Sequence, residues 1–270
     1  YVASGGQIAD TGEIRSQNGK AWRVQISDTV QPAAGAIVHL GEVLEGSPKV
    51  GDAAVAEVAR QRRQDIMRNH TATHLLHAAL HQVLGEHARQ AGSLVAPDRL
   101  RFDFNHPEAM TSEQIKRVED LVNGWALDNY ALRIEYKPLE QAKKEGAIAL
   151  FGEKYGEEVR TVTIGGEPPF SYELCGGTHL ERTGDIGVFL ITSEGSAAAG
   201  IRRIEAVTGR EAYALVQERT ALVQQSAREL KISQADLPAR VKSLQKDLAA
   251  AHKEIAALNP HFTGSRLPPI

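Results

Sequence analysis

The chain has little that could stabilise or anchor it other than burial. Its single cysteine, Cys175, among 270 residues excludes an intramolecular disulfide. No apolar run approaches the roughly 18 residues of a membrane span, and the first residues lack the basic start and apolar stretch of a signal peptide. With 31 basic against 34 acidic side chains, the net charge of -3 gives no strong general attraction for polyanions. We therefore expect a cytoplasmic protein without a membrane partner, in which any nucleic-acid binding is local.

Four successive segments differ in their residue patterns. Residues 1–59 alternate short apolar runs with Gly, Asn, Asp and Pro, which predicts a small antiparallel β-barrel or a curled sheet. Residues 60–208 interleave helices and strands without a repeating crossover unit, which predicts an α+β domain. Residues 209–258 carry apolar residues at the 3-4 spacing of a coiled coil or helical hairpin. Residues 259–270, which contain Pro and Gly, predict a disordered tail.

The second segment holds the elements that matter for chemistry. Residues 60–84 contain no Pro or Gly and carry apolar residues at helical intervals, so they predict one long helix that ends at Gly85. A loop is expected around residues 91–93. Strands are expected over residues 100–104, 132–137, 158–164, 187–192 and 201–208, and further helices open near Thr111 and Pro138.

Two pairs of side chains along this segment have the character of metal ligands. His70 and His74 are four residues apart on the long helix, so both imidazoles project from one face about one turn apart. That pair alone is weak, because such spacing arises by chance. Cys175 and His179 add a thiolate and an imidazole from a glycine-bearing turn, which completes a set of four nitrogen and sulfur ligands. We predict that these four residues bind one zinc ion.

Two further histidines continue the helical stripe. His77 and His81 follow His70 and His74 on the same face, so helix geometry alone does not fix which histidines hold the metal. Because four ligands are supplied elsewhere, packing or a hydrogen bond to a ligand is the expected role of these two. The segment also lacks the Glu after the first His that zinc proteases use as general base, which excludes a peptidase of that kind.

Three motifs together resemble the editing region of the alanyl-tRNA synthetases. They are the sequences RNHTATH at residues 68–74, CGGTH at residues 175–179 and SGGQ at residues 4–7. The combination is also similar to the freestanding AlaX-type editing proteins, whereas the related threonyl-tRNA synthetase motif ends in a Gly-Pro-His sequence that is absent here. The long helices that follow Gly209 favour a synthetase over the shorter AlaX forms, and the resemblance covers residues 1–258.

The resemblance implies both a fold and an activity. The fold would be the second additional domain type of the threonyl- and alanyl-tRNA synthetases, with zinc. The activity would be hydrolysis of the ester that joins serine or glycine to the acceptor end of tRNA(Ala). The aminoacylation core, with its ATP and Mg2+, would belong to a part absent from this chain. The chain is expected to be either a piece of an alanine–tRNA ligase or an editing protein that acts independently. Residue 1, which is Tyr rather than Met, is consistent with a piece of a longer protein.

The resemblance assigns catalytic positions to three residues. Thr73, between two ligands, would face the amino acid, and Gln90 and Ser93 would lie where the acceptor end is expected. Ala91 replaces the basic residue of the family's Gln-Lys-Gly-Ser segment, which removes that contact. Thr73 offers one donor and one acceptor to the serine hydroxyl, and an alanyl ester would leave them unpaired at a cost of about 1–3 kcal/mol. Glycine is not explained by this hydroxyl.

Substrate contacts are also expected from two regions outside the long helix. Gly5, Gly6 and Gln7 would approach the site from the N-terminal segment, with glycines that allow close backbone contact. Arg202 and Arg203 match a family strand, where they would contact phosphate or hold the structure, and a surface ion pair is an equal alternative.

The sequence leaves two questions of function open. Zinc either shapes the pocket while water is activated elsewhere, or exchanges one ligand for water. The competing function is a non-catalytic, zinc-stabilised RNA-binding or oligomerisation module, in which the helices from Arg210 onward hold a partner. The apolar seam from Val241 to Leu258 would mediate self-association or pack back on itself as a hairpin.

Overall fold

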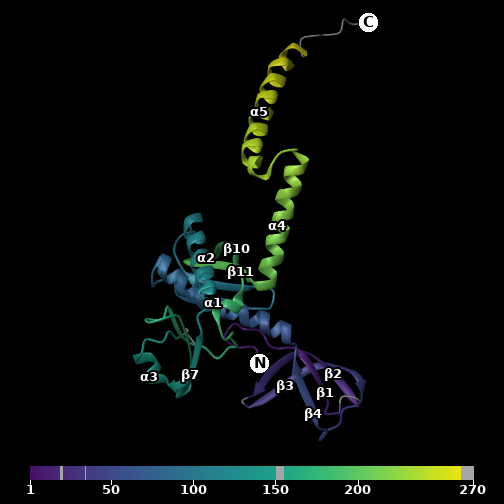
Figure 1. The fold of residues 1–270 in the computed structure, drawn as a ribbon, viewed down its shortest axis with the longest axis vertical. Helices are drawn as coiled ribbons and strands as arrows, with labels where there is room; N and C mark the ends of the chain where they lie inside the picture. Colours follow the sequence, from purple (N-terminus) through teal and green to yellow (C-terminus); the bar gives the residue numbers. More distant parts are fainter. Residues whose placement is uncertain (19–20, 34, 150–154, 263–270) are drawn as a thin grey trace. The chain divides into compact units, whose positions relative to one another are not determined.

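The computed structural model describes residues 1–18, 21–33, 35–149 and 155–262. Within them, α-helices combine with three antiparallel sheets, which confirms the predicted α+β class. The chain forms two compact units, Tyr1–Tyr213 and a second that starts at Ala214 (Figure 1). The predicted domain boundary at residue 59 falls inside the first unit, between a strand and a helix, and stays a prediction.

The N-terminal sheet has the strand order β3-β2-β1-β4, with β1 at Gly12–Ser16, β2 at Trp22–Ala33, β3 at Ala36–Gly46 and β4 at Ala54–Val58. In the described residues this sheet is open, because β3 pairs only with β2 and β4 only with β1. The β2–β3 hairpin is about twice as long as its neighbours, with strands of 12 and 11 residues beside two of 5, so much of β3 extends past β1. Of the two predicted forms, a small antiparallel barrel or a curled sheet, these residues show an antiparallel sheet without closure between β3 and β4.

Two further sheets belong to the first unit. One has the order β10-β11-β6-β5, with β5 at Gln90–Val95, β6 at Leu100–Asn105, β10 at Phe189–Ala198 and β11 at Ile201–Thr208. The other has the order β7-β8-β9, with β7 at Leu132–Pro138, β8 at Glu158–Ile164 and β9 at Ser171–Leu174. The helices between them are α1 at Arg60–Leu84, α2 at Ser112–Leu127, α3 at Leu139–Lys144 and the short 3-10 turn η1 at Thr183–Ile186.

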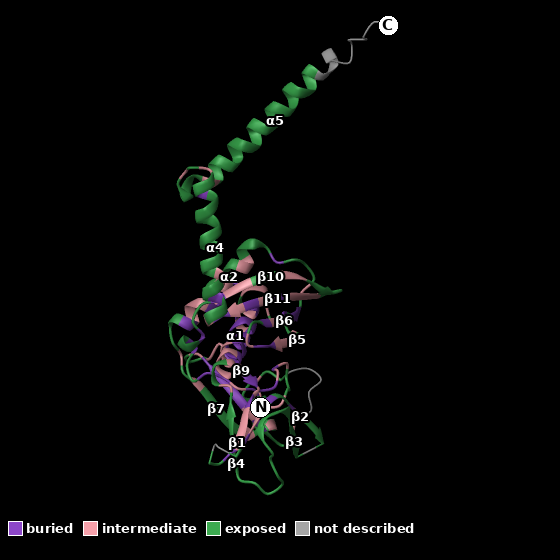
Figure 2. Cartoon of the chain, turned by 90° about the vertical axis from the view of Figure 1, so that its right-hand side faces the viewer, coloured by how far each residue is buried: buried purple, intermediate pink, exposed green. Residues whose placement is uncertain are grey.

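Helix α1 is the central element of this unit. It begins and ends as predicted, with Gly85 as the C-terminal cap, and it packs against α2 and against strands of both neighbouring sheets. Its middle is buried on almost every side (Figure 2), so the apolar core formed with Phe102, Phe104 and Val118 surrounds polar residues of the same helix. The burial of α1 therefore carries its histidines into the interior.

The segment expected to be a loop around residues 91–93 is strand β5. It pairs with β6 through a bulge between Gln90 and Gly92, and its end bonds to the N-terminal segment, where Val95 donates to the Gly6 carbonyl and accepts from the Ile8 amide. Small residues hide the alternation that marks a strand, and pairing with distant segments decides the conformation.

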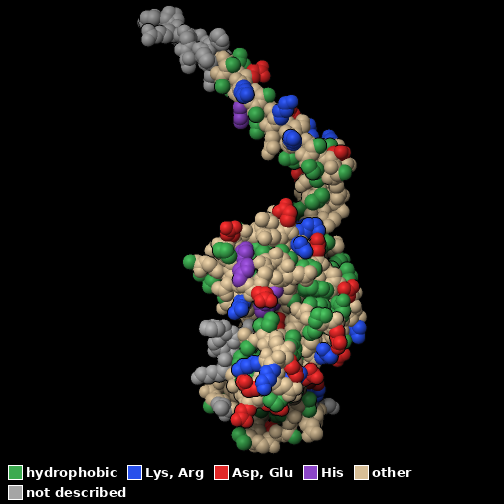
Figure 3. Space-filling model, turned by 90° about the vertical axis from the view of Figure 1, so that its left-hand side faces the viewer, with side chains coloured by type: hydrophobic (Ala, Val, Ile, Leu, Met, Phe, Trp, Pro, Cys, Tyr) green, Lys and Arg blue, Asp and Glu red, His purple; other side chains and the backbone are tan. Residues whose placement is uncertain are grey.

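The second unit consists largely of helix. Helix α4 at Gly209–Glu229 leads into it, and η2 at Gln234–Asp236 connects to α5 at Leu237–Phe262. The expected tail from residue 259 is corrected at its start, because α5 continues through Phe262, and residues 263–270 lie outside the described residues. Basic and acidic side chains are interspersed along α5 (Figure 3). In the described part of the chain, no helix has both the length and the apolarity needed to cross a membrane.

The predicted apolar seam of α5 is exposed in the single chain. Val241, Leu244, Leu248, Ile255 and Leu258 keep between 38% and 59% of their surface. Self-association through this seam stays a prediction.

Candidate metal centre and cavity

The four predicted ligands converge, although two lie on α1 and two follow β9. Each of His70, His74, Cys175 and His179 offers one ligand atom, and these atoms all lie within 4.8 Å of one another. The three imidazoles are 5–6% exposed. This is the one such cluster of three or more His, Cys, Asp or Glu residues among the described residues, and it could hold a metal ion.

Three separations between ligand atoms are close to those around a tetrahedral ion. With Zn–N bonds of about 2.0 Å and Zn–S bonds of about 2.3 Å, neighbouring ligand atoms lie about 3.3–3.6 Å apart. The two Nε2 atoms of His74 and His179 are 3.0 Å apart. Cys175 Sγ lies 3.3 Å from His70 Nε2 and 3.5 Å from His179 Nε2. These separations and the mixed nitrogen and sulfur donors fit zinc.

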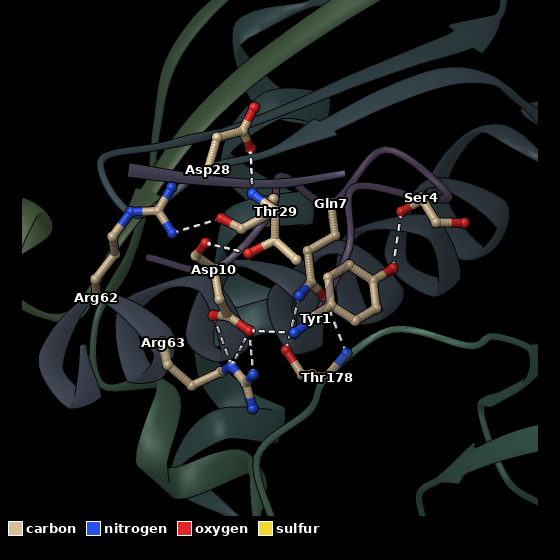
Figure 4. Close-up of polar contacts among 10 residues, drawn as sticks. Tyr1, Ser4, Gln7, Asp10, Asp28, Thr29, Arg62, Arg63 and Thr178 are labelled. Carbon is tan, nitrogen blue, oxygen red and sulfur yellow. Dashed lines mark hydrogen bonds and ion pairs between the residues drawn. The ribbon is translucent and has the colours of Figure 1, made fainter. Parts of the chain in front are cut away.

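His70 is oriented by the N-terminal segment. Its Nδ1 lies 2.7 Å from the side-chain oxygen of Gln7 and can donate to it, which directs Nε2 towards the cluster. The same oxygen accepts the Thr178 amide at 2.9 Å, and the Gln7 amide nitrogen donates to Thr178 Oγ1 (Figure 4). Gly177 lets the turn approach, because a Cβ there would lie 2.0 Å from His70 Cε1. Gln7 thus joins both halves of the cluster.

His74 is oriented by a buried carboxylate that the sequence reasoning missed. Glu173 is 4% exposed, and its two oxygens lie 3.1 Å from His74 Nδ1 and 3.4 Å from His77 Nδ1. Ser171 donates to the same carboxylate at 3.0 Å. The signal lay in the spacing, since Glu173 and Cys175 are two residues apart at the end of a strand and so share one face. His77 therefore contacts a partner of a ligand, as expected, and does not join the cluster.

Charge and burial set the protonation of the cluster. Burial lowers the pKa of His179 to about 3, so this imidazole is neutral. Burial raises the pKa of Cys175, but the nearby His70 and His179 outweigh it and hold that pKa well below its ordinary value. Burial also opposes charge on His74, yet Glu173 and Cys175 raise its pKa to about 10. Neutral imidazoles and a thiolate are the forms that bind metals, so the proton of His74 must leave when a metal binds.

The cluster opens into a cavity of about 300 Å³ that also gathers the predicted catalytic residues. Thr73, Gln90 and Ser93 line it together with His70, His74 and Cys175. Gln90 donates to Ser93 Oγ at 3.2 Å. Thr73 Oγ1 donates to the Asn69 carbonyl at 2.8 Å, so its hydroxyl proton is committed to the helix and its lone pairs remain as acceptors. The structure thus brings three residues from α1 and β5 together beside the ligands.

The four predicted substrate-binding residues do not lie together. Gly5 lines the cavity. Gly6, with a φ of +83°, packs against Ser93, whose Oγ would lie 2.2 Å from a Cβ at this position. Gln7 lies against the ligands instead. Arg202 is not among the cavity residues. It forms a two-point ion pair with Glu194 at 2.7 and 2.9 Å, so the structure shows the ion pair that was the alternative to a phosphate contact.

Arg160 is a second residue that the sequence reasoning missed. It lines the cavity, and its guanidinium donates to the carbonyls of Cys175 and Gly177 at 2.6 and 2.9 Å. These bonds hold the backbone of the CGGTH turn to strand β8. A lone arginine in a strand carries no local signal for such a contact.

Sequence comparison first identifies the class of domain. Residues 159–205 match the family described as the threonyl and alanyl tRNA synthetase second additional domain. This stretch contains Glu173 and the two ligands of the CGGTH turn.

The chain is also similar to curated relatives over nearly its whole length. The chain is 49% identical over 98% of its length to an alanine–tRNA ligase from Polynucleobacter asymbioticus. It is 47% identical over 99% of its length to the ligase from Thermus thermophilus, and 51% identical over 91% to that of Myxococcus xanthus. It spans about 30% of the length of these relatives. The resemblance to a region of the alanyl-tRNA synthetases is confirmed.

Proposed function

We propose that this chain hydrolyses the ester of serine or glycine on tRNA(Ala), as the editing part of an alanine–tRNA ligase. One observation carries the proposal: the three predicted catalytic residues line one cavity with three members of the four-residue zinc-type cluster, His70, His74 and Cys175, in a chain related to these ligases. The aminoacylation activity, with ATP and Mg2+, would reside in the parts of the ligase beyond this chain. We also keep a cytoplasmic location as part of this proposal.

Zinc would be held by the cluster ligands His70, His74, Cys175 and His179. When bound, it supplies a Lewis acid that polarises the ester carbonyl or lowers the pKa of a bound water. Because four protein ligands would fill a tetrahedral coordination sphere, the polar groups of the cavity wall would have to position the ester. Gln7 and Glu173 keep the ligand imidazoles in place, and Arg160 fixes the backbone of the turn.

Thr73 would select serine through its free lone pairs. Because its own proton is donated to the Asn69 carbonyl, it can accept the seryl hydroxyl proton but not donate to that hydroxyl. This corrects the expectation that Thr73 offers both a donor and an acceptor, because its only proton is already donated. Alanine lacks the hydroxyl and would leave the acceptor unpaired, which costs about 1–3 kcal/mol. A purely apolar pocket could not separate two such similar side chains.

The hydrolysis itself requires a water and a place for negative charge. Water adds to the ester carbonyl carbon, the bond to the ribose oxygen breaks, and that oxygen takes a proton, which yields free amino acid and uncharged tRNA. Gly176 and Gly177 line the cavity, so their backbone amides are candidates to stabilise the oxyanion. Gln90 and Ser93 form a hydrogen-bonded polar pair in the same cavity wall and would hold the ribose.

The test is deacylation of Ser-tRNA(Ala) compared with Ala-tRNA(Ala) by the purified chain, with zinc content measured on the same samples. We expect hydrolysis that is selective for serine, is abolished in Cys175→Ala and loses its selectivity in Thr73→Val while zinc is retained. A zinc-replete, folded protein that hydrolyses neither ester would favour the alternative, a zinc-stabilised RNA-binding or oligomerisation module. The exposed seam of α5 is the feature that supports this second reading.

A further inference from the structure

A second, larger cavity adjoins the one that holds the cluster. It has a volume of about 800 Å³ and is lined by residues of α1, of the turn after it, of β5 and β6, and of the segment that follows α3. Gln90 lines both cavities, so the two spaces share a wall. The proposed reaction uses no other residue of this second cavity.

Its floor contains buried polar atoms that lack partners. His77 is 2% exposed; its Nδ1 faces the Glu173 carboxylate at 3.4 Å, and its Nε2 makes no hydrogen bond to the described residues. Nε2 of His81 is likewise buried without a hydrogen-bond partner, and the two rings meet edge to face with centroids 4.3 Å apart. Buried polar groups without partners are rare in folded proteins, so these nitrogens indicate a polar ligand.

The rim supplies a cation that is not neutralised. Arg89 lines the cavity and is exposed, and its guanidinium forms no ion pair or hydrogen bond within the described residues. The side-chain amide of Asn105 lines the same space and is equally free within that part of the chain. Glu86 is the acidic residue of the rim. A free guanidinium beside an amide and two imidazoles suits a ligand with both a phosphate and a heteroaromatic ring.

We propose that this second cavity binds a nucleotide of the single-stranded acceptor end, adjacent to the esterified nucleoside. The phosphate would lie against Arg89, and the base edge would face Asn105 and the free imidazole nitrogens. This inference rests on the proposed function, because the shared wall at Gln90 connects the cavity to the one that would hold the ester. A volume of about 800 Å³ is within the ordinary range of ligand pockets, about 300–1,000 Å³.

The test compares two serine esters that differ in phosphate. One is 3′-O-seryl adenosine, which has no phosphate, and the other is the seryl ester of the trinucleotide CCA. Arg89→Ala should lower kcat/KM for the trinucleotide ester about 10-fold, as expected for a lost charge-assisted contact, and leave the nucleoside ester within about twofold. Asn105→Ala should lower it about threefold on the trinucleotide alone. Arg117→Ala, which removes an exposed arginine on α2 outside both cavities, is the matched control and should change neither.

Binding of the uncharged CCA trinucleotide separates this inference from the proposed function. Its affinity should fall about 10-fold in Arg89→Ala, and its logarithmic salt dependence should become shallower by about 0.7. If the wild-type chain hydrolyses neither ester, the proposed function fails, while this binding result still decides the subsite. Equal affinities for wild type, Arg89→Ala and Arg117→Ala, or equal losses on both esters, would overturn the nucleotide subsite.

Discussion

Helices α1 and α5 have nearly equal lengths, 25 and 26 residues, and opposite surroundings. The middle of α1 buries polar residues among apolar ones, whereas α5 exposes the apolar residues of its seam (Figure 2). In α1, the buried polar side chains reach distant segments: Asn69 donates to the Ala96 carbonyl, and Thr71 accepts the Leu180 amide. Buried polar groups that are satisfied in this way specify one arrangement of the surrounding chain.

The difference separates a region whose side chains pack within the chain from one whose apolar seam is exposed in the described residues. Each polar contact of α1 fixes a particular segment, so the ligands arrive at the cluster in a defined geometry. No described residue covers Leu248 or Ile255. Either these side chains stay in contact with solvent, or a second molecule buries them and stabilises α5.

The largest expected effect is at the closest contact of the cluster. Gly177→Ala would place a Cβ 2.0 Å from His70 Cε1, so a ligand or the turn must move. We expect the zinc affinity to fall by more than about 100-fold. This is more than the loss expected when a ligand loses a residue that hydrogen-bonds to it, because here the ligand itself is displaced. Gly176→Ala is the matched control, since a Cβ there meets nothing within 4 Å, and it should keep its zinc. Equal zinc affinities in competition with a chelator would show that the turn does not depend on this contact.

A direct comparison of the two helices follows. Leu76→Ala removes a side chain of α1 that is fully buried, and it should lower the free energy of unfolding by about 2–5 kcal/mol. Leu248→Ala removes one of α5 that is 58% exposed, and it should change that free energy by less than about 0.5 kcal/mol. Denaturant titration that follows the unfolding of the unit containing each residue measures both changes. A large loss in Leu248→Ala that grows on dilution would instead reveal an association through the seam.

The helix and the ligand set were predictable because their signals are local. A stretch without Pro or Gly that ends at Gly85 defines α1, and two pairs at four-residue spacing define the donors. The partners of the ligands were not predictable in this way. Gln7 and Glu173 reach His70 and His74 across long separations in the chain, through β5 and β9, and both strands are short and paired by tertiary contacts. The choice between a barrel and a curled sheet was open for the same reason, since alternation within a strand does not reveal which strands pair at the edges of the sheet.

A smaller effect is expected from the carboxylate that orients a ligand. Glu173→Gln keeps the shape of the side chain but removes the charge that faces His74 and His77, so zinc affinity should fall about 10- to 100-fold. Zinc competition measures this without recourse to activity. Glu157→Gln, an exposed change just before β8, should leave the affinity unchanged. An unaltered affinity in Glu173→Gln would mean that its carboxylate does not support the ligand.

The smallest effect concerns the pair that joins the N-terminal segment to the first turn of α1. Asp10 is 5% exposed and bonds to Arg63, with Nε at 2.8 Å from Oδ1 (Figure 4). Burial raises the pKa of Asp10, but hydrogen bonds and charge from Arg63 and the Tyr1 amino group outweigh it and hold that pKa below the ordinary 3.8. A carboxylate with a lowered folded-state pKa stabilises the protein above its unfolded pKa and loses this contribution as the pH falls through the folded value.

Asp10→Asn should therefore lower the free energy of unfolding at pH 7 by about 1–3 kcal/mol, the cost of a lost charge-assisted bond. The difference between variant and wild type should shrink as the pH falls below about 4, because the wild-type carboxyl then gains its proton. Urea titrations at neutral and acidic pH measure both values. A difference that stays constant with pH would assign the loss to packing of the N-terminal segment and not to the charge of Asp10. The contact between Asp10 and Arg63 would then stabilise the start of α1 through the fit of the side chains and not through their charges.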